Sequence, residues 1–143
     1  MIENRLYSEI FTDFNNQCHT DLERRSFLLN IREPNFLDFL RCCFDPNIVF
    51  DVDLPESYRP AIEPAGLNWT TLTKEMHKMY RFVKNHPTKP PELTKKKQTA
   101  LLLGLLESLH KDEARLLVQM INKDLKVDNL TKELVLTAYP NLF

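Results

Sequence analysis

The sequence predicts an all-α fold, a single compact domain of about six to seven helices with a proline-rich ordered loop near residues 46–69. Three observations support this class. The 143 residues include only two glycines, which leaves tight β-hairpin turns poorly supplied. Apolar residues recur at helical spacing along most of the chain. Finally, 43% of the residues are hydrophobic and 27% charged, a balance typical of a globular domain with its own core.

Three helices are predicted in the N-terminal third. The first spans Ile2–Phe14. The second follows Thr20, which forms a T-x-x-E capping box with Glu23 and so satisfies free amides of the first turn. The third opens at Pro34, a favoured first-turn residue, and stops at Asp45-Pro46. The expected inward positions are Leu6, Ile10, Phe11 and Phe14 in the first helix, and Phe36, Leu37, Leu40, Cys43 and Phe44 in the third.

The segment from Ile48 to Leu67 has a different character, because it contains three prolines and Gly66. Its many aromatic and aliphatic residues predict an ordered loop that wraps the core rather than a linker between domains. The run Ile48–Phe50 within it could be extended. Trp69, Tyr58 and Tyr139 could stack on bases or dock a partner, although such aromatic residues more often close the rim of a core.

Four more helices are expected after the loop. One runs from Thr70 or Thr71 to about Asn85, and the next, capped by Thr94, is expected to be the central helix. Asp112 opens another, and Thr131 caps a last short helix that ends before Tyr139-Pro140. The expected inward positions are Leu72, Met76, Met79, Tyr80 and Val83, then Leu101, Leu102, Leu105, Leu106 and Leu109, then Leu116, Leu117, Met120 and Ile121.

The formal net charge of −1 conceals two oppositely charged halves. Residues 1–70 contain 6 Lys/Arg and 12 Asp/Glu, whereas residues 71–143 contain 13 and 8. Eight of the cations lie between Lys74 and Lys97, against only Glu75 and Glu92, and three lysines crowd the first turn of the Thr94 helix. Ammonium groups and free amides converge there, as in a phosphate-binding site. A solvated surface would show the same pattern, so both interpretations stay open. The candidate nucleic-acid-binding residues are Lys74, Lys78, Arg81, Lys84, Lys95, Lys96, Lys97 and Lys123.

No enzyme site is predicted, and neither a cofactor nor a metal is expected. The four histidines are scattered, and Glu107 with His110 lacks the second pair that a carboxylate-bridged metal site needs. Two glycines 38 positions apart exclude the glycine-rich phosphate loops. The odd number of cysteines, two of them adjacent, indicates buried thiols in a reducing compartment. No apolar run is long enough for a membrane span, so a cytoplasmic location is expected.

The order of segments resembles the N-terminal helical DNA-binding domain of ATP-dependent DNA ligases, particularly those of large tailed phages. Phe36–Arg41 and Ile48–Phe50 carry part of this resemblance, and the stretches Ala100–Leu109, Glu113–Leu125 and Leu134–Leu142 carry the stronger part. The chain is also similar to an uncharacterised family of small proteins of T-even-like phages. In the ligases this domain grips the duplex backbone through basic residues and helix ends. No lysine here stands in a K-x-D-G motif, so we expect no self-adenylation.

Two functions of different classes follow. The first is a non-catalytic phage accessory protein that contacts the backbone of duplex DNA through a basic face, in the cytoplasm of the host cell. The alternative is an adaptor or inhibitor of a host or phage protein, which uses the helical scaffold without DNA contact. A small-molecule enzyme is less favoured, because no convergent set of polar residues is visible.

Overall fold

The computed structural model describes residues 5–143, which form seven α-helices and one 3₁₀ helix around a continuous apolar core. Within this range the only β-type pairing is an isolated antiparallel bridge between Phe50 and Val83. The predicted all-α class is confirmed. None of the helices in residues 5–143 combines the length and the apolar character that a bilayer crossing requires.

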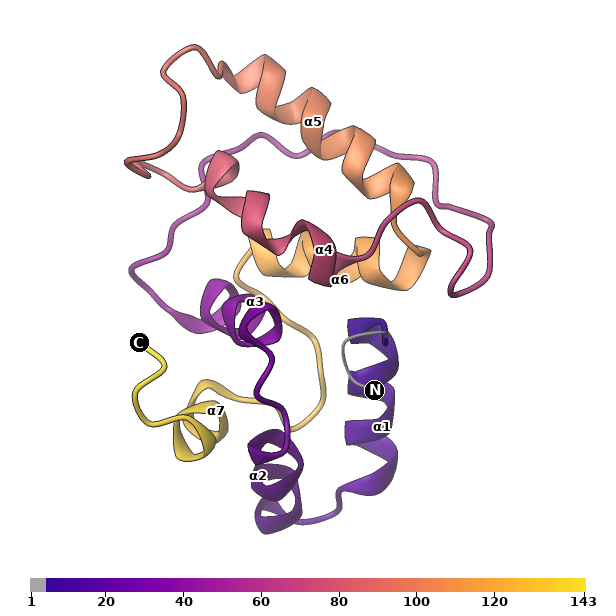
Figure 1. The fold of residues 1–143 in the computed structure, drawn as a ribbon, viewed down its shortest axis with the longest axis vertical. Helices are drawn as coiled ribbons and strands as arrows, with labels where there is room; N and C mark the ends of the chain where they lie inside the picture. Colours follow the sequence, from indigo (N-terminus) through magenta and orange to yellow (C-terminus); the bar gives the residue numbers. More distant parts are fainter. Residues whose placement is uncertain (1–4) are drawn as a thin grey trace.

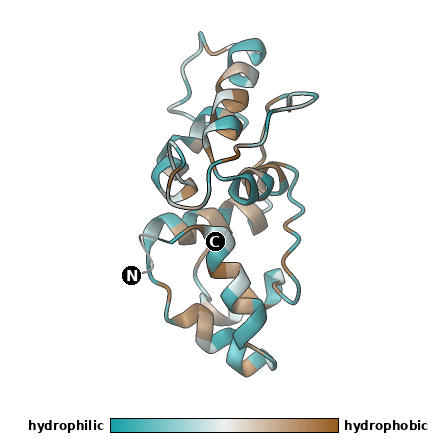
Figure 2. Cartoon of the chain, turned by 90° about the vertical axis from the view of Figure 1, so that its right-hand side faces the viewer, coloured by the Kyte–Doolittle hydropathy of each residue, from teal (hydrophilic) through white to brown (hydrophobic). Residues whose placement is uncertain are grey.

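The elements are α1 (Tyr7–Gln17), α2 (Asp21–Leu29), α3 (Pro34–Phe44), α4 (Leu72–Glu75), the 3₁₀ helix η2 (Met76–Phe82), α5 (Lys95–Ser108), α6 (Lys111–Ile121) and α7 (Lys132–Ala138). Figure 1 shows α4, η2, α5 and α6 in one half of the molecule and α1, α2 and α7 in the other, with α3 between them. Figure 2 shows the same elongated body from the side, with hydrophobic residues interleaved along its helices.

Local signals placed most of the helix starts correctly. The hydroxyls of Thr20, Thr94 and Thr131 accept hydrogen bonds from amides in the first turns of α2, α5 and α7. The Thr20–Glu23 capping box is present, and Pro34 is the first residue of α3. The start of the first helix is different, because α1 begins at Tyr7, and the predicted positions Ile2 to Asn4 lie outside the described residues.

The segment after Thr71 departs from the predicted helix. Only one turn is α-helical, and the chain then tightens into η2. Side chains three residues apart eclipse in a 3₁₀ helix, so the buried row becomes Met76, Met79 and Phe82. An α-helix would instead have buried Tyr80 and Val83, which are only half-buried here. The α-helical periodicity assumed for this segment was therefore wrong beyond Glu75.

The central helix is α6 and not α5, contrary to the expectation. Helix α6 contacts α1, α3 and α5, and its residues Ala114, Leu117 and Met120 are fully buried. Helix α5 lies at the edge of the fold in Figure 1, and Leu101 on its outer face is 39% exposed. Five leucines between positions 101 and 106 predicted a central place for α5, but the hydrophobicity of a segment does not determine how many other helices it contacts.

Glu113 in the first turn of α6 is a fully buried carboxylate that joins three helix N-termini. The Tyr7 N–H, in the first residue of α1, donates to Glu113 Oε2 at 2.8 Å, and the Leu72 N–H, in the first residue of α4, donates to Oε1 at 3.0 Å. Both amides belong to first turns and have no acceptor within their own helices. Desolvation raises the pKa of Glu113 above its ordinary value of 4.5, and the two amide donors oppose that rise.

We expect Glu113→Gln to lower the free energy of unfolding by about 1–3 kcal/mol, because the amide –NH₂ cannot accept one of the two hydrogen bonds. The pH dependence should change as well. Since the folded-state pKa is raised, the carboxyl group stabilises the fold most below pH 4.5 and loses this contribution as the pH rises through the folded value. The wild type should therefore lose more stability than the variant over that interval, as measured by urea unfolding at several pH values. Glu133→Gln, at an exposed position on α7, is the control. Parallel pH profiles for all three proteins would contradict this role of Glu113.

Candidate nucleic-acid interface

A cluster of lysines lies where the η2–α5 loop, which also contains Glu92, meets the first turn of α5. We call it the lysine end, formed by Lys84, Lys89, Lys95, Lys96 and Lys97. All are exposed except Lys89, which is half-buried. In Figure 1 this loop and the start of α5 form one extremity of the molecule.

Backbone pairing brings the acidic half of the chain to the lysine end. The Asp51 N–H donates to the Phe82 carbonyl and the Lys84 N–H donates to the Val49 carbonyl, both at 2.7 Å, on either side of the Phe50–Val83 bridge. Asp51 is thereby fixed close to Lys84, and its carboxylate forms an ion pair with Lys95. A hydrogen bond from Lys95, followed by the charges of Lys95, Lys89 and Lys84, lowers the pKa of Asp51. Asp51 thus stays ionised and neutralises part of the cluster.

The first turn of α5 combines free backbone amides with three lysines, an arrangement that does not stabilise the helix itself. Thr94 Oγ1 accepts the Lys97 N–H at 3.2 Å, whereas the amides of Lys95 and Lys96 have no acceptor within the helix. Cations at a helix N-terminus oppose the macrodipole and cost a few tenths of a kcal/mol each. Three consecutive lysines at this position therefore destabilise the helix slightly, while they favour a bound anion such as phosphate.

The predicted cations of α4 and η2 do not extend the lysine end into one uniform ridge. Lys78 lies 3.6 Å from Glu75, and Arg81 is half-buried with its guanidinium 5.4 Å from the ring centre of Phe82. Arg81 Nε also donates to the carbonyl of Lys78 at 3.1 Å. Lys74 is exposed but belongs to the opposite end of the α4–η2 segment, where it borders a cavity with Arg5. Carboxylates therefore interrupt the predicted basic face.

Lys123 has a structural role, which corrects its assignment to the basic face. Its ammonium group donates to the carbonyls of Cys42 and Asp45, at the C-terminus of α3, and lies 5.6 Å from the ring centre of Phe50. The backbone of Lys123 is left-handed, with φ of 55°, a conformation that costs a non-glycine residue about 1–2 kcal/mol. Burial lowers the pKa of its ammonium group. Lys123 is exposed as a whole, but its ammonium group is engaged by the carbonyls at the end of α3.

Sequence reasoning did not select one member of the lysine end, Lys89, or the carboxylate beside it, Asp51. Lys89 lay within the basic run but was not singled out, although its charge reaches Asp51. Asp51 itself could not be found by inspection of the basic run, because 44 positions separate it from Lys95. Its only sequence signal was the expected extended run Ile48–Phe50 directly before it.

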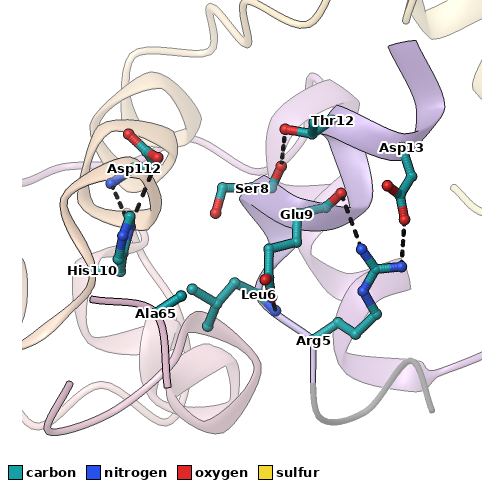
Figure 3. Close-up of a pocket in the computed structure, with 9 residues that line it drawn as sticks. All are labelled: Arg5, Leu6, Ser8, Glu9, Thr12, Asp13, Ala65, His110 and Asp112. Atoms are coloured by element: carbon teal, nitrogen blue, oxygen red, sulfur yellow. Dashed lines mark hydrogen bonds and ion pairs between the residues drawn. The ribbon is translucent and has the colours of Figure 1, made fainter. Parts of the chain in front are cut away.

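The cavity in Figure 3 is the main alternative site. It has a volume of about 370 Å³ and lies between α1, the start of α6 and Ala65. The Arg5 guanidinium pairs with Asp13, and Glu9 Oε1 accepts the Leu6 N–H at 2.9 Å. Asp112 lies 3.3 Å from Arg115. The charged groups that line this cavity thus already have partners, either in its wall or outside it.

The remaining polar candidates serve local structure. Glu107 Oε2 accepts the Arg59 N–H at 2.8 Å, and His110 Nδ1 accepts the Asp112 N–H at 3.1 Å as the cap of α6. All three cysteines are free and buried, and burial raises the pKa of Cys42 to about 11. A thiol with such a pKa is a poor nucleophile at neutral pH. Within residues 5–143 no three histidine, cysteine or acidic side chains are grouped so as to hold a metal ion.

The chain was compared with known protein families, curated proteins and solved structures. The model of a family of unknown function, DUF6433, matches residues 12–127. No curated protein and no solved structure matches significantly.

Replacing Lys123 should affect stability, whereas replacing a member of the lysine end should not. We expect Lys123→Met to lower the free energy of unfolding by about 1–3 kcal/mol, since the carbonyls of Cys42 and Asp45 lose a charged donor. Lys96→Met, at an exposed position, should stay within about 0.5 kcal/mol of the wild type. Urea unfolding of the three proteins checks both values. Equal stability of the two variants would contradict the structural role of Lys123.

Proposed function

The chain belongs to the family of unknown function DUF6433, and we propose that it is a non-catalytic accessory protein that binds the backbone of duplex DNA through the lysine end. The observation that carries the proposal is the convergence of Lys84, Lys89 and Lys95 around one carboxylate, Asp51, with Lys96 and Lys97 next to them in the first turn of α5. The resemblance to phage-type ligase DNA-binding domains supports the same class of function. It also suggests a phage protein that acts in the cytoplasm of the host.

The chemistry of the lysine end fits a polyanion better than a small anionic substrate. Its ammonium groups are exposed at an extremity and do not line a closed cavity, so they can reach successive phosphates along a strand. Lysine acts as a mobile point charge and not as a bidentate fork, which suits contacts that do not depend on base sequence. Free amides in the first turn of α5 add donors for a phosphate oxygen. Binding should therefore be electrostatic and independent of sequence.

The charge balance predicts the salt dependence of binding. Asp51 neutralises one of the five lysines, which leaves about four to contact phosphates. A plot of the logarithm of the binding constant against the logarithm of the salt concentration should then have a slope of about −3.6. Lys96→Ala combined with Lys97→Ala should flatten the slope by about 1.8. Fluorescence anisotropy of labelled intact and nicked duplexes between low and moderate salt measures these slopes.

A substitution that is expected to raise DNA affinity makes the test specific. Asp51→Asn removes the carboxylate that neutralises Lys95 while it keeps the side-chain shape, so DNA affinity should rise several-fold and the slope should steepen by about 0.9. Lys132→Ala on α7, in the other half of the molecule, should leave both quantities unchanged. Absence of binding at tens of micromolar protein in low salt, or equal effects of the lysine-end and Lys132 variants, would refute the proposal.

The second candidate function is the adaptor or inhibitor predicted as an alternative. A specific observation favours it: Ile62, Leu67 and Trp69 are 93%, 70% and 89% exposed, although they fall within eight residues of one another. Single exposed apolar residues are common, but a cluster marks an association surface. A partner protein would be recovered by affinity purification from nuclease-treated lysate of cells that contain the protein. Recovery that depends on intact nucleic acid would count against this function.

A further inference from the structure

The exposed cluster Ile62, Leu67 and Trp69, which we call the apolar tip, belongs to a loop with a defined conformation. The Leu67 N–H donates to the Pro64 carbonyl at 3.1 Å across a turn in which Gly66 has φ of 92°, a value that favours glycine at this turn position. Asn68 Nδ2 donates to the Glu63 carbonyl at 3.5 Å. Hydrogen bonds within the loop therefore fix a conformation in which Ile62, Leu67 and Trp69 are exposed to solvent.

Both ends of this loop are attached to the last turn of α5. The Arg59 N–H donates to Glu107 Oε2 at 2.8 Å, and the Thr70 N–H donates to the Ser108 carbonyl at 3.4 Å. In Figure 1 the loop and the lysine end lie on opposite sides of the upper half of the molecule, beyond the two ends of α5. The apolar tip is thus pre-organised and well separated from the cluster proposed to contact DNA. Pre-organisation lowers the entropy that association must overcome.

An apolar groove lies next to the base of the same loop. Leu54, Tyr58, Leu106 and Val118 are among its lining residues, and its volume is about 410 Å³. Cavities of roughly 300–1,000 Å³ hold bound organic groups in proteins, so the groove has room for an indole ring. Since Trp69 is 89% exposed, the tip of the chain does not fill its own groove.

Charges beside the tip and the groove are complementary. Lys74 shares a cavity wall with Gly66 of the tip loop and Glu63 lies within that loop, whereas Glu56 lines the groove and Arg59 lies between two residues that line it. All four residues are exposed, and no ion pair involves any of them within residues 5–143. When the tip of one molecule enters the groove of another, a free ammonium group approaches a free carboxylate. Such an arrangement favours this pairing over pairing of like surfaces.

We propose that the occupant of the apolar groove is the apolar tip of a second copy of this chain, exchanged reciprocally about a two-fold axis. The tip loop and the groove lie next to each other at the end of α5, so one two-fold axis can bring each tip against the groove of the other copy, as an isologous interface requires. A tryptophan buries roughly 150–250 Å². Two buried tryptophans therefore cover roughly 300–500 Å², well below the about 1,600 Å² of a standard interface, so the dimer is expected to be weak and reversible. The proposal is independent of DNA binding, because the lysine end stays free at the distal ends of the dimer.

The single tryptophan of the chain reports directly on this interface. Full-length protein is diluted from about 200 to 1 μM, and its mass is measured by sedimentation equilibrium while the Trp69 emission spectrum and iodide quenching are recorded. We expect the mass to double with concentration, and the emission to shift to the blue and become protected from iodide over the same range. A monomer at every concentration overturns the proposal, as does a dimer in which Trp69 remains quenchable.

Variants assign the two sides of the interface separately. Trp69→Ser and Val118→Glu should each raise the dimer dissociation constant about tenfold or more, the first by removal of the tip and the second by a charge in the groove. Leu22→Ser removes an apolar residue that is 72% exposed on α2 and should leave dimerisation unchanged. Circular dichroism confirms that each variant is folded. If Leu22→Ser weakens the dimer as much as Trp69→Ser, or if Trp69 emission shifts only when duplex DNA is added, the proposed interface is wrong.

Discussion

Glu113 connects the two halves of the fold through a single carboxylate. It stands in the first turn of α6 and accepts the first-turn amides of α1 and α4, which reach it from 106 and 41 positions away. Water is excluded at this point, so the three helices cannot separate without leaving amides or a charge unpaired in an apolar surrounding. Helix α6 also packs against α3 and α5, so this carboxylate ties the starts of α1 and α4 to the helix that contacts most of the core.

The two surfaces of functional interest depend on this framework and lie at opposite ends of α5. At its start, the loop after η2 meets the segment around Asp51. At its end, Glu107 and Ser108 hold the loop that presents Trp69. Helix α5 spans about 20 Å at 1.5 Å per residue, so the polar and the apolar surface are physically separate. A dimer through the apolar tip would thus present two lysine ends, and two modest electrostatic contacts held together would bind a duplex more tightly than either alone.

Charge segregation along the sequence does not survive as segregation in space. The acidic half contributes the carboxylate of Asp51 to the lysine end, where it pairs with Lys95, so that folding partly neutralises the basic half. The remaining excess of ammonium groups at the start of α5 is real but modest. This distribution is compatible with reversible, salt-sensitive attachment to a phosphate backbone, and it would not support tight binding by one lysine end alone.

The sequence by itself determined the helical class, the caps at Thr20, Thr94 and Thr131, the start of α3 at Pro34 and most of the buried stripe of α1 and α6. These features depend on interactions between residues three or four positions apart, which a pattern can display. Tertiary structure alone decided the 3₁₀ path of η2, the central place of α6, the ion pair of Asp51 with Lys95 and the capping role of Lys123. It likewise decided that Tyr139 closes the core, with its hydroxyl donating to the Leu28 and Ile31 carbonyls, whereas Trp69 points to solvent. Each of these outcomes depends on which distant segment occupies the neighbouring space, and the local pattern of apolar and charged residues carries no information about that.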